Sequence, residues 1–333
     1  MSTTTNLLNV FLPSLHDKHR PIKDYSDGLP AVDHLESPQR VHELLKGIQA
    51  SRPIKLNEID ALAYNAVYQV HDKDYVDFLM AISETIPQGQ EYIPSYFGEN
   101  LQQAPIQFQG GMYCREIGTP IGPGTITAAL NSAAAAQLAA EYITNYKASC
   151  IALCRPPGHH AGKRRYGGYS YFNNAYIAAN TLSHHGKCAV LDIDYHMGEG
   201  SAELASAQTP YFSLHANPHT NYPYLDSPLK ISTLHTELVN LKAGIQGEEY
   251  MKLLNGVCQK ISQLDLDFLI LSLGFDTLDS DTLQDDRVHL TTNDYSEISK
   301  TVAGLNIPII VLLEGGYAVN DLYDCGKAFT KHL

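Results

Sequence analysis

A short, mostly apolar run, residues 188–193, overlaps the stretch Leu191-Asp192-Ile193-Asp194-Tyr195-His196-Met197-Gly198. Such a run is typical of a strand that is covered on both faces. On an extended chain successive side chains point to opposite faces, so Asp192, Asp194 and His196 are expected to project to the same side. The stretch therefore predicts a buried parallel strand that ends in polar, metal-binding side chains.

Similar apolar runs recur along the chain and alternate with segments of helical length. The other strand-like runs are residues 7–12, 150–153, 211–214, 268–273 and 307–313. The helix-length segments are residues 125–146, 171–184, 248–264 and 294–305. This alternation predicts an α/β fold with a mostly parallel open sheet and helices on both faces. Because we find no linker or internal repeat, residues 1–333 are expected to form a single catalytic domain.

Composition narrows the class of protein. The apolar fraction of 44% is that of a globular chain with a sizeable core. The net charge of −13 argues against nucleic acid and anionic membranes as direct partners. Neither a secretory signal nor a run of about 18 apolar residues is found, so we expect a cytoplasmic protein. The six cysteines lack zinc-ribbon spacing and are expected to be reduced, packed thiols.

Residues with catalytic or metal-binding side chains follow five of the apolar runs. They occupy residues 156–160, 192–196, 213–215, 274–276 and 314–317. In open α/β sheets, ligands bind beyond the carboxyl ends of the strands. The sequence therefore predicts one site built from five strand ends.

Asp194, His196 and Asp276 are of the residue types that bind zinc. Carboxylates and imidazoles suit a borderline Lewis acid, and a third ligand from another strand leaves a position open for water and substrate. Asp276 follows the buried run 268–273, where an unpaired carboxylate would be costly. Taken alone, each aspartate can equally be a helix N-cap or an ion-pair partner. The three together favour a metal site.

Two further stretches carry candidate catalytic groups. In Arg155-Pro156-Pro157-Gly158-His159-His160, the turn places adjacent histidines where they can act as acid and base. Tandem histidines alone are weak evidence, since His184-His185 stands at an expected helix end. In Glu314-Gly315-Gly316-Tyr317, the glycines allow a tight turn that exposes the tyrosine hydroxyl as an oxyanion donor. The alternative is a core tyrosine with its hydroxyl hydrogen-bonded.

Taken together, these motifs give the chain a resemblance to a known superfamily. It resembles the zinc-dependent deacetylases, the histone deacetylases and acetylpolyamine amidohydrolases, which share the arginase-like α/β fold. The matching motifs, from about Leu35 to Tyr317, are Glu36-Ser37-Pro38-Gln39-Arg40, Val70-His71 with Tyr75, residues 156–160, Gly168-Tyr169-Ser170-Tyr171-Phe172-Asn173-Asn174, residues 192–196, Gly274-Phe275-Asp276-Thr277 and residues 314–317. Their joint order is highly specific.

The resemblance implies roles for the residues at the strand ends. The ligands that it implies for one zinc ion per chain are Asp194, His196 and Asp276. The metal and His160, as general base, would generate the nucleophile from water. His159 would be the electrostatic partner of His160 or the proton donor to the leaving amine. Tyr317 would join zinc in stabilising the tetrahedral oxyanion.

The resemblance also implies supporting groups and a second ion. Asp192 would orient His159, and Glu199 stands where the family places an Asp, Asn or Gln facing the other histidine. Glu199 departs from the family pattern, and so does Met197, where many members have a second histidine. Both differences are expected to affect the base, and with it the rate and pH profile of the reaction. A structural potassium ion is expected beside the same strand. Its expected ligands are Asp192, Asp194, His196, Ser213 and Leu214.

The substrate-binding residues that the resemblance implies lie on loops. Gly168, Tyr169 and Tyr222 are expected to wall a narrow acyl-amine tunnel, the alternative being ordinary loop packing. Glu116 matches an acidic position that binds a distal ammonium in acetylpolyamine amidohydrolases, the alternative being a solvated glutamate. Residues 88–112 lack periodicity and, by the resemblance, would build a homodimer that narrows the mouth of the site.

We therefore expect a deacetylase that hydrolyses acetylpolyamines or similar small acetyl-amides to acetate and a free amine. The alternative is a protein acetyl-lysine deacetylase of the histone type. A dinuclear manganese hydrolase of the arginase type would need further Asp and His ligands that we do not find. An inactive acetyl-ligand-binding protein would lack a ligand, a histidine or the tyrosine, and all are present.

Overall fold

One parallel sheet forms the centre of the computed structural model, which describes residues 7–25, 30–225 and 235–333. From edge to edge its eight strands are β4 (Ile54–Ile59), β1 (Leu8–Pro13), β5 (Cys150–Ala152), β12 (Ile309–Leu313), β10 (Phe268–Leu273), β6 (Cys188–Asp192), β7 (Tyr211–Ala216) and β8 (Thr236–Leu241). All neighbouring pairs are parallel. The carboxyl ends of the strands therefore lie along one edge, as predicted.

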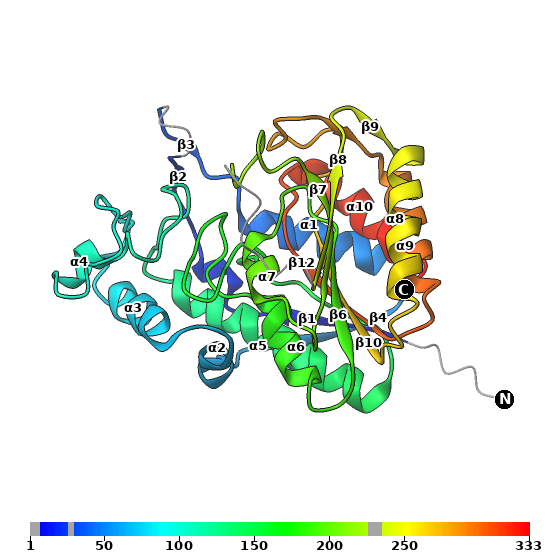
Figure 1. Ribbon diagram of the computed structural model, residues 1–333, viewed down its shortest axis with the longest axis horizontal. Helices are drawn as coiled ribbons and strands as arrows, with labels where there is room; N and C mark the ends of the chain where they lie inside the picture. Colours follow the sequence, from blue (N-terminus) through cyan, green and yellow to red (C-terminus); the bar gives the residue numbers. More distant parts are fainter. Residues whose placement is uncertain (1–6, 26–29, 226–234) are drawn as a thin grey trace.

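Helices cover both faces of this sheet (Figure 1). They are α1 (Pro38–Ser51), α2 (Tyr64–Val70), α3 (Lys73–Ser83), α4 (Ile106–Gln109), α5 (Thr125–Tyr146), α6 (Asn174–Leu182), α7 (Glu199–Leu204), α8 (Gly247–Ile261), α9 (Thr292–Ala303) and α10 (Leu322–Phe329). Helices α1, α8, α9 and α10 share one apolar cluster with the sheet. Helices α5 and α6 share another, in which alanines bring α5 close to the strands. The predicted α/β fold with helices on both faces is confirmed.

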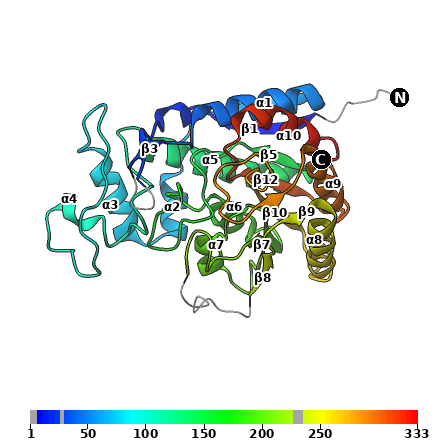
Figure 2. The same cartoon turned by 90° about the horizontal axis from the view of Figure 1, so that it is seen from above.

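A third apolar cluster extends the body to one side. It joins α2, α3 and the first half of α5 to the loops around residues 113 and 171. Figures 1 and 2 place α3 and α4 beside the sheet, away from α8 and α9. Within the described residues, no helix combines the length and apolarity needed to cross a membrane. All six cysteines are buried and free, as predicted.

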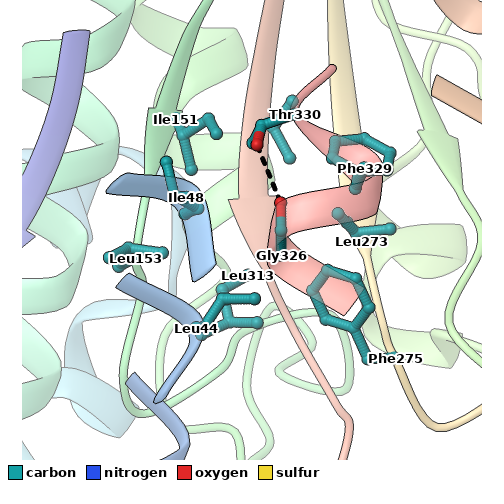
Figure 3. A pocket seen from close by; sticks show the side chains of 11 residues that line it. Leu44, Ile48, Ile151, Leu153, Leu273, Phe275, Leu313, Gly326, Phe329 and Thr330 are labelled. Atoms are coloured by element: carbon teal, nitrogen blue, oxygen red, sulfur yellow. Dashed lines mark hydrogen bonds between the residues drawn. The ribbon is translucent and has the colours of Figure 1, made fainter. Parts of the chain in front are cut away.

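The crossing of α1 and α10 shows how closely the helices pack. A Cβ atom at Gly47 would lie 2.0 Å from the carbonyl oxygen of Tyr323. Next to this crossing, Leu44, Phe275 and Phe329 line a cavity of about 10 Å³ between the two helices and the sheet (Figure 3). Its lining is almost wholly apolar and it has room for about one water molecule, so we interpret it as a packing gap.

We expect Gly47→Ala to lower the free energy of unfolding by ~1–3 kcal/mol, because the added methyl group meets rigid backbone. Gly256→Ala on α8 is the control, since nothing lies within 4 Å of its Cβ position. Alanine in that open helical site should stabilise the protein by ~0.5–1 kcal/mol. Denaturant unfolding measures both variants; similar effects at the two positions would contradict the close helix crossing.

Candidate active site

The three candidate metal ligands meet at the carboxyl edge of the sheet. Asp194 and His196 follow β6, and Asp276 follows the neighbouring strand β10. One ligand atom from each residue lies within 4.8 Å of the others. Both aspartates are buried, and the side chain of His196 is 14% exposed. The fold thus brings together ligands that are 80 residues apart in sequence.

Backbone groups fix the two carboxylates. Asp194 Oδ1 accepts from the amide of His196 at 2.9 Å, and its Oδ2 accepts from the amide of Gly315 at 2.7 Å. A Cβ atom at Gly274 would lie 2.3 Å from Asp194 Oδ2. A Cβ atom at Gly315 would lie 2.3 Å from Asp276 Oδ2. A side chain at either glycine would therefore displace a carboxylate of the cluster.

The electrostatics of this cluster fit a divalent cation. Burial and the charge of Asp194 raise the pKa of Asp276, because two adjacent carboxylates resist sharing negative charge. Although burial opposes its protonation, the two aspartates raise the pKa of His196. The pocket thus favours positive charge between its three side chains. Two carboxylates and one imidazole form a donor set that suits zinc.

The histidine pair stands beside the cluster on the turn that follows β5. His159 Nδ1 lies 3.0 Å from Asp192 Oδ2, and His160 Nδ1 lies 2.5 Å from Glu199 Oε2. The two ring centroids are 4.0 Å apart. Because each Nδ1 faces a carboxylate, Nε2 of each ring is the nitrogen available for proton exchange.

The surroundings push the pKa values of the two histidines in opposite directions. Burial opposes protonation of His159, but Asp194 and Asp192 more than offset it and raise its pKa well above the usual range. Burial and the charge of His159 lower the pKa of His160 to about 4. The surroundings therefore favour the charged form of His159 and the neutral form of His160. Such a split is what an acid and base pair requires.

Glu314 and Arg115, to which the sequence analysis assigned no role, support the histidines. Glu314 Oε2 accepts from the amides of Gly158 at 2.8 Å and His159 at 3.1 Å, and so holds the turn. Arg115 Nε lies 2.8 Å from Glu199 Oε1 and compensates the negative charge of the Glu199 carboxylate, which faces the His160 ring. Glu314 belongs to the same motif as Tyr317, which could have indicated its role. No sequence pattern around Arg115 indicates a role for that residue.

A buried ion-pair cluster joins this turn to the Tyr317 loop. Glu36 Oε1 accepts from Arg40 Nη1 at 2.9 Å and from Arg155 Nε at 2.8 Å, and all three side chains are fully buried. Arg40 Nε also donates to the carbonyl oxygen of Gly316 at 2.6 Å. Its guanidinium carbon lies 4.6 Å from the centre of the Tyr317 ring. One carboxylate therefore positions both catalytic loops.

A cavity of about 520 Å³ opens onto the cluster. Its lining includes the candidate catalytic residues His160 and Tyr317, and the candidate metal ligand His196. The four predicted substrate-binding residues, Glu116, Gly168, Tyr169 and Tyr222, line it as well. A Cβ atom at Gly168 would lie 2.3 Å from His160 Cδ2, so this glycine allows the loop to touch the base. The Tyr222 ring stands edge-on to His160, with centroids 4.9 Å apart.

Acidic side chains also line this cavity. Glu116 Oε1 accepts from the Gly168 amide at 3.0 Å and from Thr119 Oγ1 at 2.5 Å, so its carboxylate braces the cavity wall. Asp24 Oδ2 accepts from the Tyr169 hydroxyl, and Asp285 is a further lining residue. The structure therefore gives Glu116 a bracing contact that the sequence did not reveal.

The residues predicted to bind potassium lie on adjacent strands. Asp192 on β6 and Ser213 on β7 are partners in the parallel register, and Leu214 is the next residue. Ser213 Oγ lies 2.7 Å from His215 Nδ1, and Asp192 Oδ2 accepts from the Tyr211 hydroxyl at 2.7 Å. Potassium binding stays a prediction.

The fold and the site define an α/β enzyme built around a carboxylate and imidazole metal cluster. Comparison with known proteins identifies the family. A model of the histone deacetylase domain matches residues 34–333. The acetylpolyamine amidohydrolase of Mycoplana ramosa is 32% identical over 326 residues, covering 92% of this chain and 94% of the relative.

Two other proteins are similar to this chain. The crystal structure of an acetylpolyamine aminohydrolase from Burkholderia pseudomallei superposes with a TM-score of 0.89 at 26% identity, covering 97% of each chain. Histone deacetylase 15 of Arabidopsis thaliana is 31% identical over 210 residues, covering 60% of this chain and 38% of the relative. The chain belongs to the histone deacetylase family. It is a hydrolase of the deacetylase class, as the sequence predicted.

Proposed function

We propose that the protein is a zinc-dependent amidohydrolase that releases acetate from acetylpolyamines or similar small acetylated amines. The observation that carries this proposal is the convergence of the ligand cluster, His160 and Tyr317 on one cavity with acidic side chains in its lining. The similarity to the acetylpolyamine amidohydrolase of Mycoplana ramosa is 32% identity over 92% of this chain, whereas histone deacetylase HDA1 of Candida albicans, matched over 90% of this chain, is 25% identical.

The residues supply the proton transfers of amide hydrolysis. When bound by Asp194, His196 and Asp276, a zinc ion supplies Lewis acidity next to the scissile amide. His160, the neutral ring, accepts a proton from the attacking water as the water oxygen bonds to the acetyl carbon. As the carbon–nitrogen bond breaks, the amine takes up a proton, for which the charged His159 is the nearby donor.

Tyr317 and Glu199 stabilise the charges that arise during this sequence. The Tyr317 hydroxyl donates to the developing oxyanion. Burial raises the pKa of Tyr317 well above its usual range, although Arg40 opposes the shift, so the hydroxyl keeps its proton. Glu199 stabilises the imidazolium that forms at His160, and Asp192 does so at His159. The products are acetate and a free amine.

The acidic cavity supports a cationic substrate. Asp24, Glu116 and Asp285 place negative charge in the lining, and Arg115 is paired with Glu199. This charge favours an acetylated polyamine over a neutral amide. Tyr169 and Tyr222 offer aromatic faces against which an alkyl chain can pack.

We expect the zinc-loaded protein to hydrolyse acetylputrescine and acetylspermidine faster than an acetyl-lysine peptide. Product formation is followed by amine release, with a chelator as control. Preference for the peptide would support the protein deacetylase alternative. Turnover that survives the chelator, or no turnover of any substrate, would refute the zinc-hydrolase proposal itself.

The proposal extends to assembly and to a second ion. Residues 88–112 expose aromatic side chains at Tyr96, Phe97 and Phe108, which supports their role as a dimerisation loop at the mouth of the site. The proposed structural potassium ion would lie beside the paired strands β6 and β7, with Asp192, Asp194, His196, Ser213 and Leu214 as its ligands. The cytoplasmic location and the exclusion of nucleic acid stay predictions from the sequence.

A further inference from the structure

A second group of metal-binding side chains lies outside the active site. His16 and Asp17 belong to the short helix η1 (His16–Lys18), and His42 lies on α1. One ligand atom from each residue lies within 4.8 Å of the others. His16 Nδ1 is 3.5 Å, and His42 Nε2 is 3.7 Å, from the same oxygen, Asp17 Oδ1.

Polar atoms in this group lack the hydrogen bonds that burial normally demands. His16 is 4% exposed, and within the described residues neither His16 Nδ1 nor Asp17 Oδ1, both buried atoms, has a hydrogen-bond partner. The two atoms face each other only across a long ion-pair contact of 3.5 Å, which leaves room for a closer partner.

We propose that His16 Nδ1, Asp17 Oδ1 and His42 Nε2 bind a second divalent transition-metal ion of the zinc class, in a structural role. Bonds from zinc to nitrogen and oxygen of about 2.1 Å place tetrahedral ligands roughly 3.4 Å apart. The separations of 3.5 and 3.7 Å approach this spacing. The side chains of Asp17 and His42 are 47% and 48% exposed, so water can complete the coordination.

The proposed ion links η1 to α1 next to the backbone carbonyl groups that hold Arg155. The carbonyl oxygen of His16 accepts from Arg155 Nη1 at 2.5 Å, and that of His19 accepts from Arg155 Nη2 at 2.7 Å. Arg155 directly precedes the turn that carries His159 and His160. The metal therefore fixes the backbone segment on which Arg155 depends.

The test measures zinc content of the full chain after chelation, dialysis against zinc ions and removal of free metal. We expect two zinc ions per chain in the wild type and one in His42→Ala, whose exposed side chain can be removed without disturbing the core. His184→Ala, at an exposed histidine after α6, is the matched control and should keep both ions. One ion in the wild type, or equal content in the two histidine variants, would overturn the proposal.

A second readout separates this site from the catalytic one. In Asp276→Ala, which loses a catalytic ligand, added zinc should still raise the temperature of unfolding, because an ion that binds only the folded state stabilises it. Adding His42→Ala to that variant should abolish the shift, whereas adding His184→Ala should not. A zinc-induced shift that survives His42→Ala would contradict the assignment, whatever the outcome of the activity assays. The inference is independent of the proposed function.

Discussion

Tyr317→Phe is expected to lower kcat by about 100-fold or more while the zinc content stays unchanged, because it removes one donor to the oxyanion. The ring itself should keep its place. Arg40 packs against one side of it, and the Tyr169 ring stands edge-on at a centroid distance of 5.7 Å. The Tyr317 backbone amide donates to Asp281 Oδ2 at 2.5 Å. The substitution therefore isolates the hydroxyl.

Tyr224→Phe is the matched control for this experiment. Tyr224 lines the same cavity, but its hydroxyl donates to Asp285 Oδ2 at 2.8 Å. Its loss should leave kcat near the wild-type value. Steady-state kinetics on an acetylated amine, with metal analysis of each variant, provide the comparison. Equal kcat values for Tyr317→Phe and the wild type would refute the oxyanion role.

Glu36→Ala is expected to lower the free energy of unfolding by ~3–5 kcal/mol, since it leaves buried positive charge without its partner. Arg40 and Arg155 both donate to this carboxylate, and neither side chain reaches solvent. Glu43→Ala on α1, the helix that carries Arg40, is the control. Glu43 pairs with Lys46 at the surface, at 2.7 Å, and such pairs contribute ~0–1 kcal/mol. Similar losses in the two variants would contradict the burial argument.

The same carboxylate makes stability depend on pH. Burial opposes ionisation of Glu36, but Arg155, His19 and Arg40 more than offset it and hold its pKa well below the usual range. A carboxylate with a depressed pKa stabilises the fold above its unfolded pKa of about 4.3, and this contribution is lost as pH falls further. Unfolding measured below pH 4.3 should therefore depend less steeply on pH in Glu36→Gln than in the wild type.

The central strands were predictable because burial on both faces leaves an uninterrupted apolar run. All six predicted strands form, with ends that differ by no more than two residues. The edge strands β4 and β8 were missed. Each has one neighbour instead of two and carries charged side chains, such as the exposed Lys55 and the half-buried Glu237, that break the apolar run. Predicted helix 171–184 begins instead at Asn174, because the Asn173 side chain caps it.

The strand ends also indicated that the three candidate metal ligands lie together, since parallel strands bring their carboxyl ends to one edge. The sequence could not reveal contacts between residues that lie far apart in the chain. Arg40 and the Gly316 carbonyl are 276 residues apart, and no periodic pattern relates them. The pairing of Arg115 with Glu199 likewise depends on how the loop before α5 folds over the sheet. Helix α1 was not predicted. Residues 36–40, which include its first turn, were interpreted only as a family motif.

The crowding of Gly274 and Gly315 against the two aspartates restricts how this enzyme can be altered by directed evolution. A library that exchanges Asp194 or Asp276 for histidine must fit a larger ring where even a methyl group at the neighbouring glycines has no room. A histidine at either carboxylate would therefore press its ring against the backbone of Gly274 or Gly315. The cavity wall at Tyr169 and Tyr222 is where new specificities can be selected.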